Sequence, residues 1–124
     1  MNIIQADAQE LPFVDERFDV SVMCEVLEHL ACKDNCLREF TRVTKHDGWG
    51  VVTLPNFLHP RQFLAAFRHI QPIETPVTAY SIKKLICQQR GWRIHDVASA
   101  LGYTNSCRCV PLLGLHSAFL LRRV

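Results

Sequence analysis

The sequence lacks long apolar runs and has few glycines. No apolar run approaches the roughly 20 residues that a helix needs to cross a bilayer, so no membrane span is predicted. The five glycines all lie at or after Gly48, which excludes a glycine-rich phosphate-binding loop from the part of the chain before it. The first residues also lack the basic stretch followed by an apolar stretch that marks a secretory signal.

An excess of charge of one sign is also missing. The chain has 14 basic and 12 acidic residues, which gives a net charge of +2. Nucleic-acid-binding domains usually carry a clear basic excess with clustered arginines and lysines, so there is no strong nucleic-acid signal. A length of 124 residues with 48% hydrophobic residues fits a single small globular domain and excludes a disordered tail.

The six cysteines do not follow the spacing of a zinc site or a disulfide framework. The two closest pairs, Cys32 with Cys36 and Cys107 with Cys109, lack the CxxC spacing of a zinc knuckle. We therefore expect six reduced, unliganded thiols and a cytoplasmic location. A structural metal at these cysteines is the alternative.

Hydrophobic periodicity predicts an α/β fold. Strands are expected at residues 2–6, 18–24, 50–54, 92–97 and 117–121, and helices at 35–44, 62–70 and 81–89, with Asp34 and Ser81 as helix caps. The strands at 18–24 and 50–54 flank one amphipathic helix, which predicts adjacent parallel strands. Ligands of such sheets collect at the carboxyl ends of the strands. The residues expected there are Asp7–Ala8, Cys24–Val26 and Pro55–Asn56.

Five blocks of the sequence resemble a class I S-adenosylmethionine-dependent methyltransferase. The blocks are Asp7–Phe13, Phe18–Val20, Glu25–Leu30, Leu37–Val43 and Gly48–Asn56. The resemblance covers residues 3–56 well and residues 81–124 more loosely. In the glycine pair of this family, Trp49 stands where the second glycine is usual, and that glycine is displaced to Gly50. The resemblance implies a partial Rossmann-like fold, mainly a parallel sheet with a C-terminal antiparallel hairpin strand.

The resemblance also implies methyl transfer from S-adenosylmethionine to a small-molecule acceptor that the sequence leaves unidentified. It assigns Asp7 and Ala8 to the adenine of the cofactor, since a carboxylate accepts a hydrogen bond from the exocyclic amine and alanine leaves room for the ring. A turn-capping role is the alternative for Asp7. Cys24 and Glu25 end the central strand, where the family lines the methionine side and the methyl group.

Glu25-x-x-Glu28-His29 is a second candidate site, because this spacing predicts three side chains on one face of a helical turn. The run is similar to one in ubiquinone-pathway O-methyltransferases, where the corresponding residues are associated with a divalent metal. A Mg²⁺ site at Glu25, Glu28 and His29 is therefore one hypothesis. His29 as a general base is another, and a purely structural role of Glu28 and His29 is a third. The remaining histidines, His116 among them, are expected on the surface or in loops.

Two elements of the family have no counterpart here, namely the glycine-rich loop and the acidic residue that binds the ribose. In the family's strand order, the missing strands lie between the strand at 2–6 and the strand at 18–24. Residues 1–124 are thus predicted to form a single, N-terminally incomplete domain with an open sheet edge.

Two functions follow from this open edge. The chain is an enzyme completed by an N-terminal half or by another chain, or a non-catalytic methyltransferase-like module that pairs with a partner chain there. A nicotinamide-dependent oxidoreductase, the third option, is disfavoured because the glycine-rich loop is missing.

Overall fold

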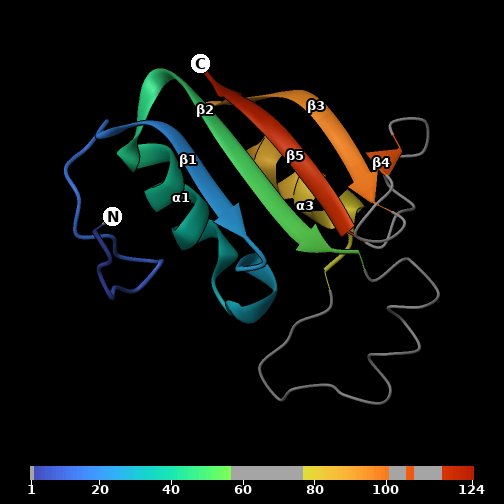
Figure 1. Ribbon diagram of the computed structural model, residues 1–124, viewed down its shortest axis with the longest axis horizontal. Coiled ribbons are helices and arrows are strands. Elements are labelled where there is room, and N and C mark those ends of the chain that lie inside the picture. The colour runs from blue at the N-terminus through green and yellow to red at the C-terminus, as the bar shows by residue number, and fades with distance from the viewer. Residues whose placement is uncertain (1, 57–76, 101–105, 108–115) are drawn as a thin grey trace.

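The computed structural model describes residues 2–56, 77–100, 106–107 and 116–124, which form one mixed sheet and its helices (Figure 1). The strands are β1 (Phe18–Cys24), β2 (Thr44–Pro55), β3 (Trp92–Ala100), β4 (Ser106–Cys107) and β5 (His116–Arg123). The helices are the 3-10 turn η1 (Leu27–His29), α1 (Lys33–Val43) and α3 (Ala79–Gln88). The helix predicted at 62–70 lies outside the described residues. No described helix has the length and apolarity that a membrane crossing requires.

The strand order is β1-β2-β5-β3-β4. β1 and β2 are parallel and are joined through α1, which confirms the predicted βαβ unit. β5 is antiparallel to both β2 and β3, so β1, β2 and β3 run in one direction and β5 runs against them. The α/β fold with an antiparallel C-terminal strand is therefore confirmed.

Both α-helices pack on the same face of the sheet. Alternate residues of each strand point to this face, and most of their buried side chains are apolar. The main-chain pairing places Met23, Val52 and Phe119 side by side across β1, β2 and β5. These side chains join one buried cluster with residues of the two helices. The helix residues in the cluster are Cys36, Leu37, Phe40, Ala79, Ile82 and Ile86. This face holds the core of the described structure.

The opposite face is only partly covered by the described residues. Val51 and Leu120, which pair across β2 and β5, are half-buried there. On β1 the exposure is greater, at 54% for Val20 and 60% for Val22. Among the described strands, β1 pairs only with β2, so its other edge is open.

The predicted strand at residues 2–6 is wrong. These residues form no regular element, and Ile3 and Ile4 are 83% and 58% exposed. A strand needs a neighbour to satisfy its main-chain hydrogen bonds, and no described strand pairs with this segment. The two-residue strand β4 also lies in a region that the sequence predicts as loop.

The predicted helix caps are displaced. The N-cap of α3 is Thr78, whose hydroxyl accepts the Ser81 N–H, while the Ser81 hydroxyl accepts the Thr78 N–H. Ser81 is thus the reciprocal residue of a capping box, three positions later than the cap itself. Likewise, Asp34 lies in the first turn of α1, and the N-cap is Cys32.

Candidate functional site

The carboxyl edge of the sheet contains a strained turn directly after β1. Glu25 has φ +51°, in the left-handed region that costs a residue other than glycine about 1–2 kcal/mol. Its N–H donates to the carbonyl oxygen of Thr53 on β2 at 3.1 Å. This bond fixes the turn against the sheet, beside the exposed Cys24.

The Glu25 side chain contacts a histidine from the other end of the sequence. Because β5 is antiparallel to β2, its first residue, His116, pairs with Pro55 at the carboxyl edge. The distance between Glu25 Oε2 and His116 Nδ1 is 3.5 Å, and the two side chains are 40% and 36% exposed. Sequence reasoning missed this pair, because the only signal for it is the register of an antiparallel strand.

The predicted metal site at Glu25, Glu28 and His29 finds no support. The 3-10 turn begins only at Leu27, after the left-handed Glu25, so the expected single helical face does not form. Glu25 contacts His116, whereas the Glu28 carboxylate is buried and lies 3.8 Å from His29 Nε2. In the part of the chain that is described, no three His, Cys, Asp or Glu side chains are grouped to hold a metal ion.

Asp7 takes part in a local turn and still presents groups for a ligand. Its Oδ1 accepts the Gln9 N–H at 2.8 Å, and its carbonyl oxygen accepts the Glu10 N–H at 3.0 Å, so the turn-capping alternative is present. Within the described residues, Asp7 Oδ2 and the Ala8 N–H make no hydrogen bond. One acceptor and one donor side by side fit the donor and acceptor pattern on the edge of an adenine ring.

A clamp formed by Glu39 and Arg42 of α1 holds the segment between Asp7 and β1. Glu39 accepts the Leu11 N–H at 2.8 Å, and Arg42 donates to the carbonyl oxygens of Leu11 and Phe13. Arg42 also donates to Asp15 at 2.7 Å and pairs with Glu39. The hydrogen bond from Arg42, above all, lowers the pKa of Glu39 to about 2. The clamp thus connects two of the sequence blocks and has a structural role.

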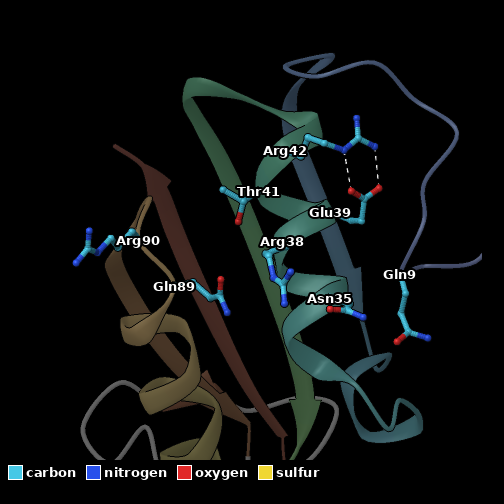
Figure 2. A pocket seen from close by; sticks show the side chains of 8 residues that line it. All are labelled: Gln9, Asn35, Arg38, Glu39, Thr41, Arg42, Gln89 and Arg90. Carbon is cyan, nitrogen blue, oxygen red and sulfur yellow. Dashed lines mark hydrogen bonds and ion pairs between the residues drawn. The ribbon is translucent and has the colours of Figure 1, made fainter.

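A hollow of about 550 Å³ lies along α1 and the turn after α3 (Figure 2). Its lining residues are Gln9, Asn35, Arg38, Glu39, Thr41, Arg42, Gln89 and Arg90. Arg42 and Arg90 come just before the first residues of β2 and β3, so that part of the hollow lies toward the amino ends of the strands. Asn35, near the beginning of α1, lines the other end of the hollow, and the ion pair of Glu39 and Arg42 belongs to the clamp.

The cysteines with described side chains are free thiols. Cys24, Cys32 and Cys87 are exposed and Cys36 is buried. Burial, above all, raises the pKa of the Cys36 thiol to about 11, so this thiol is protonated at neutral pH. These four agree with the expectation of reduced thiols.

Comparison with known proteins shows a similarity to methyltransferases. Residues 1–52 match the methyltransferase domain family. Over 45 residues, 36% of this chain and 18% of the other, the sequence is 47% identical to the ubiquinone/menaquinone biosynthesis C-methyltransferase of Idiomarina loihiensis.

The fold is similar to that of solved methyltransferases. For a Thermotoga maritima S-adenosylmethionine-dependent methyltransferase, titled a possible histamine N-methyltransferase, the TM-score is 0.85 at 14% identity. That alignment covers 98% of this chain and 63% of the other. For an Archaeoglobus fulgidus S-adenosylmethionine-dependent methyltransferase, the TM-score is 0.71 at 18% identity, covering 98% of this chain and 67% of the other.

This chain therefore spans less than two thirds of the Thermotoga protein and about a fifth of the Idiomarina protein. The family match covers residues 1–52, less than half of the chain, and the fold is that of solved S-adenosylmethionine-dependent methyltransferases.

Proposed function

We propose that the chain is part of an S-adenosylmethionine-dependent methyltransferase that acts on a small-molecule acceptor. The observation that carries the proposal is the family match over residues 1–52, which contain both the Asp7 turn and the end of β1. When bound, the cofactor supplies a methyl group on a sulfonium, which is a good leaving group by itself. The protein then has to align the acceptor and take its proton.

In this proposal Asp7 Oδ2 and the Ala8 N–H hold the adenine. The turn after β1, at Cys24 and Glu25, lies along the methionine side of the cofactor. His29 is the base predicted by the sequence, and its ring is half-exposed in the 3-10 turn that follows this strand end. The free thiols support a reducing, cytoplasmic location.

We further propose that a polypeptide segment completes the site by adding to the open edge of β1. Two hollows support this proposal. One, of about 250 Å³, is lined in part by Val20, Val22 and Phe40, and the other, of about 650 Å³, by Ile3, Ile4 and Phe13. An open edge with apolar side chains beside it is the arrangement to which an added strand binds. The segment is an N-terminal part of the same protein or a partner chain.

The same edge supports a second candidate function, a non-catalytic module that binds a partner through β1. Cofactor binding separates the two functions. We expect the 124-residue chain to bind S-adenosylmethionine weakly or not at all, and a chain extended upstream to bind it. Two or three missing hydrogen bonds, each of about 1.5–3 kcal/mol, weaken binding by a factor of about 10² or more.

The experiment is isothermal titration calorimetry of both chains with S-adenosylmethionine. Asp7→Ala in the extended chain should lose binding, and Asp34→Ala, an exposed aspartate on α1, serves as the control. Micromolar binding by the short chain would show that it needs no added segment. Full binding by the Asp7→Ala variant would contradict the adenine role of Asp7, and no binding by the extended chain would favour the non-catalytic module.

A further inference from the structure

The clamp of Glu39 and Arg42 is the polar connection between the segment that carries Asp7 and the rest of the described chain. Among the described residues, every hydrogen bond that links residues 7–15 to another part of the chain goes to one of these two side chains. The other hydrogen bonds of the segment join its own residues to one another. Apolar contacts with the core and with an aromatic ring of β1 complete its packing. The position of the main chain in this segment therefore depends on two side chains of α1.

Arg42 uses all of its donors in the clamp. Its guanidinium makes five hydrogen bonds, as many as it has N–H groups. Two of them go to the carbonyl oxygens of Leu11 and Phe13, and the other three go to the carboxylates of Asp15 and Glu39. Glu39 in turn accepts the Leu11 N–H, so Leu11 is held at both its N–H and its carbonyl oxygen. The planar fork of arginine permits this arrangement, and the single ammonium group of a lysine does not reproduce it.

The residue that the clamp holds comes directly after the turn at Asp7. This turn closes with the bond from the Glu10 N–H to the Asp7 carbonyl oxygen at 3.0 Å, and Leu11 is the next residue. Gln9, within the turn, lines the same hollow as both clamp residues (Figure 2), so the turn lies beside the clamp. Because no linking residue separates the turn from Leu11, a displacement of Leu11 displaces the turn.

We propose that Glu39 and Arg42 are positioning residues for the adenine of the cofactor, through the turn that contains Asp7 and Ala8. This inference rests on the proposed function, which gives Asp7 Oδ2 and the Ala8 N–H to that ring. Neither clamp residue contacts the cofactor. They keep the acceptor and the donor in place beforehand, so that binding does not have to order them.

Arg38 offers a matched control for Arg42. It has the same side chain on the same helix, one turn earlier, and it lines the same hollow. In the described part of the chain, Arg38 makes no hydrogen bond or ion pair. Arg42→Lys and Arg38→Lys both keep the charge and remove the fork, but only the first removes bonds to the segment.

The first measurement is ¹⁵N relaxation NMR of the 124-residue chain, which gives order parameters for single amides. The informative amides are those of Gln9 and Glu10, which both donate to Asp7. We expect order parameters of about 0.85, typical of a rigid backbone, in the wild type and in Arg38→Lys, and values below about 0.6 in Arg42→Lys. Order parameters that do not fall in Arg42→Lys would overturn the inference.

A core amide shows whether the variant is still folded. Val52 is fully buried, so its amide should stay rigid in every variant and should exclude a general loss of structure. If the Val52 amide also becomes mobile in Arg42→Lys, the milder Glu39→Gln decides. Its order parameters at the turn should fall below those of the wild type, and unchanged values would overturn the inference.

The second measurement compares two ligands of the extended chain by calorimetry. S-inosylhomocysteine has an oxygen in place of the exocyclic amine of S-adenosylhomocysteine, so it cannot donate to Asp7. The wild type and Arg38→Lys should prefer S-adenosylhomocysteine by about tenfold, the effect of one hydrogen bond to a charged group. Arg42→Lys should lose most of this preference, whereas a loss of stability alone would weaken both ligands equally and keep their ratio. An unchanged preference in Arg42→Lys would overturn the inference.

The two measurements keep this inference and the proposed function apart. If the wild-type extended chain binds neither ligand, the proposed function is contradicted, and the order parameters still decide whether the clamp positions the turn. Equal binding of both ligands by the wild type would contradict the adenine role of Asp7 and, with it, the inference.

Discussion

The two faces of the sheet are made from alternate residues of the same strands, yet they differ in what covers them. Leu121 and Leu120 are neighbours on β5, and the first is fully buried under the helices while the second is half-buried on the other face. On β1 the contrast is stronger, since Met23 is buried and Val22 is 60% exposed. The hydrophobic pattern alone therefore does not say which face is covered. One face holds the core, and the other is only partly covered by the residues that the structure describes.

The largest effect should come from shortening the two adjacent leucines. Leu121→Ala should cost about 3 kcal/mol, because it leaves a cavity in the core. Leu120→Ala should cost about 1 kcal/mol, since its side chain is already partly in water. Urea denaturation of both variants measures the difference. Equal losses would mean that the two faces are equally covered.

A second effect should appear where the covered face is most crowded. A Cβ at Gly50 would lie 2.9 Å from ring atoms of both Phe40 and Trp92. Gly50→Ala should therefore cost about 2 kcal/mol through overpacking. Thermal unfolding tests this, with Thr53→Ala, on the other face of the same strand, as the control. A Gly50→Ala variant as stable as the wild type would show that the two rings move apart easily.

A third effect depends on pH and concerns the clamp. The folded-state pKa of Glu39 is about 2, below its ordinary value of 4.5. The stability from this carboxylate is thus fully present above pH 4.5 and is lost as the pH falls toward 2. Glu39→Gln should cost about 1 kcal/mol at neutral pH and should flatten this acid decline. Glu10→Gln, on an exposed residue, is the control, and an unchanged acid decline in Glu39→Gln would contradict the assignment.

The smallest effect on stability should come from the open edge. Val20→Thr with Val22→Thr replaces exposed side chains with others of similar shape, so the free energy of unfolding should change by less than about 0.5 kcal/mol. Association at high concentration, measured by sedimentation, should nevertheless fall severalfold, because open apolar edges promote pairing. Val14→Thr, at an exposed residue outside the strands, is the control. Identical sedimentation of all three proteins would count against strand addition at β1.

Periodicity was sufficient to predict the elements with local signals. The strand at Phe18–Cys24, the helix that follows it and the parallel return strand all form as their apolar spacing indicates. The strand expected at 2–6 does not form. A strand needs a partner strand beside it, and the apolar spacing of residues 2–6 does not show whether one is present. The cap predicted at Ser81 is displaced by three residues, because a capping box contains two residues that each resemble a cap. The cap predicted at Asp34 is displaced because the N-cap of α1, Cys32, makes no side-chain hydrogen bond and so carries no sequence signal.

The candidate site was predicted only where family motifs mark it. The assignment of Asp7 and Ala8 to the cofactor rests on these motifs and stays a prediction, whereas Glu39 and Arg42 lie in a motif whose structural purpose the clamp explains. Trp49 departs from the family pattern without disturbing the fold, because the cramped positions are Gly48 and Gly50 on either side of it. Its ring instead lies 4.7 Å from the guanidinium of Arg122.

The position of β5 has a consequence for the order of events during synthesis. This strand comes last in the sequence and yet lies between β2 and β3. In a nascent chain that has emerged only as far as β3, β1 and β2 can pair but β3 has no partner strand, and the gap beside β2 exposes the buried sides of Val52 and Trp92. In such a chain the core stays open until His116–Arg123 has been synthesised and can pair with β2 and β3. A chain cut before His116 would lack the strand that joins β2 to β3, and these parts of the described sheet could not close.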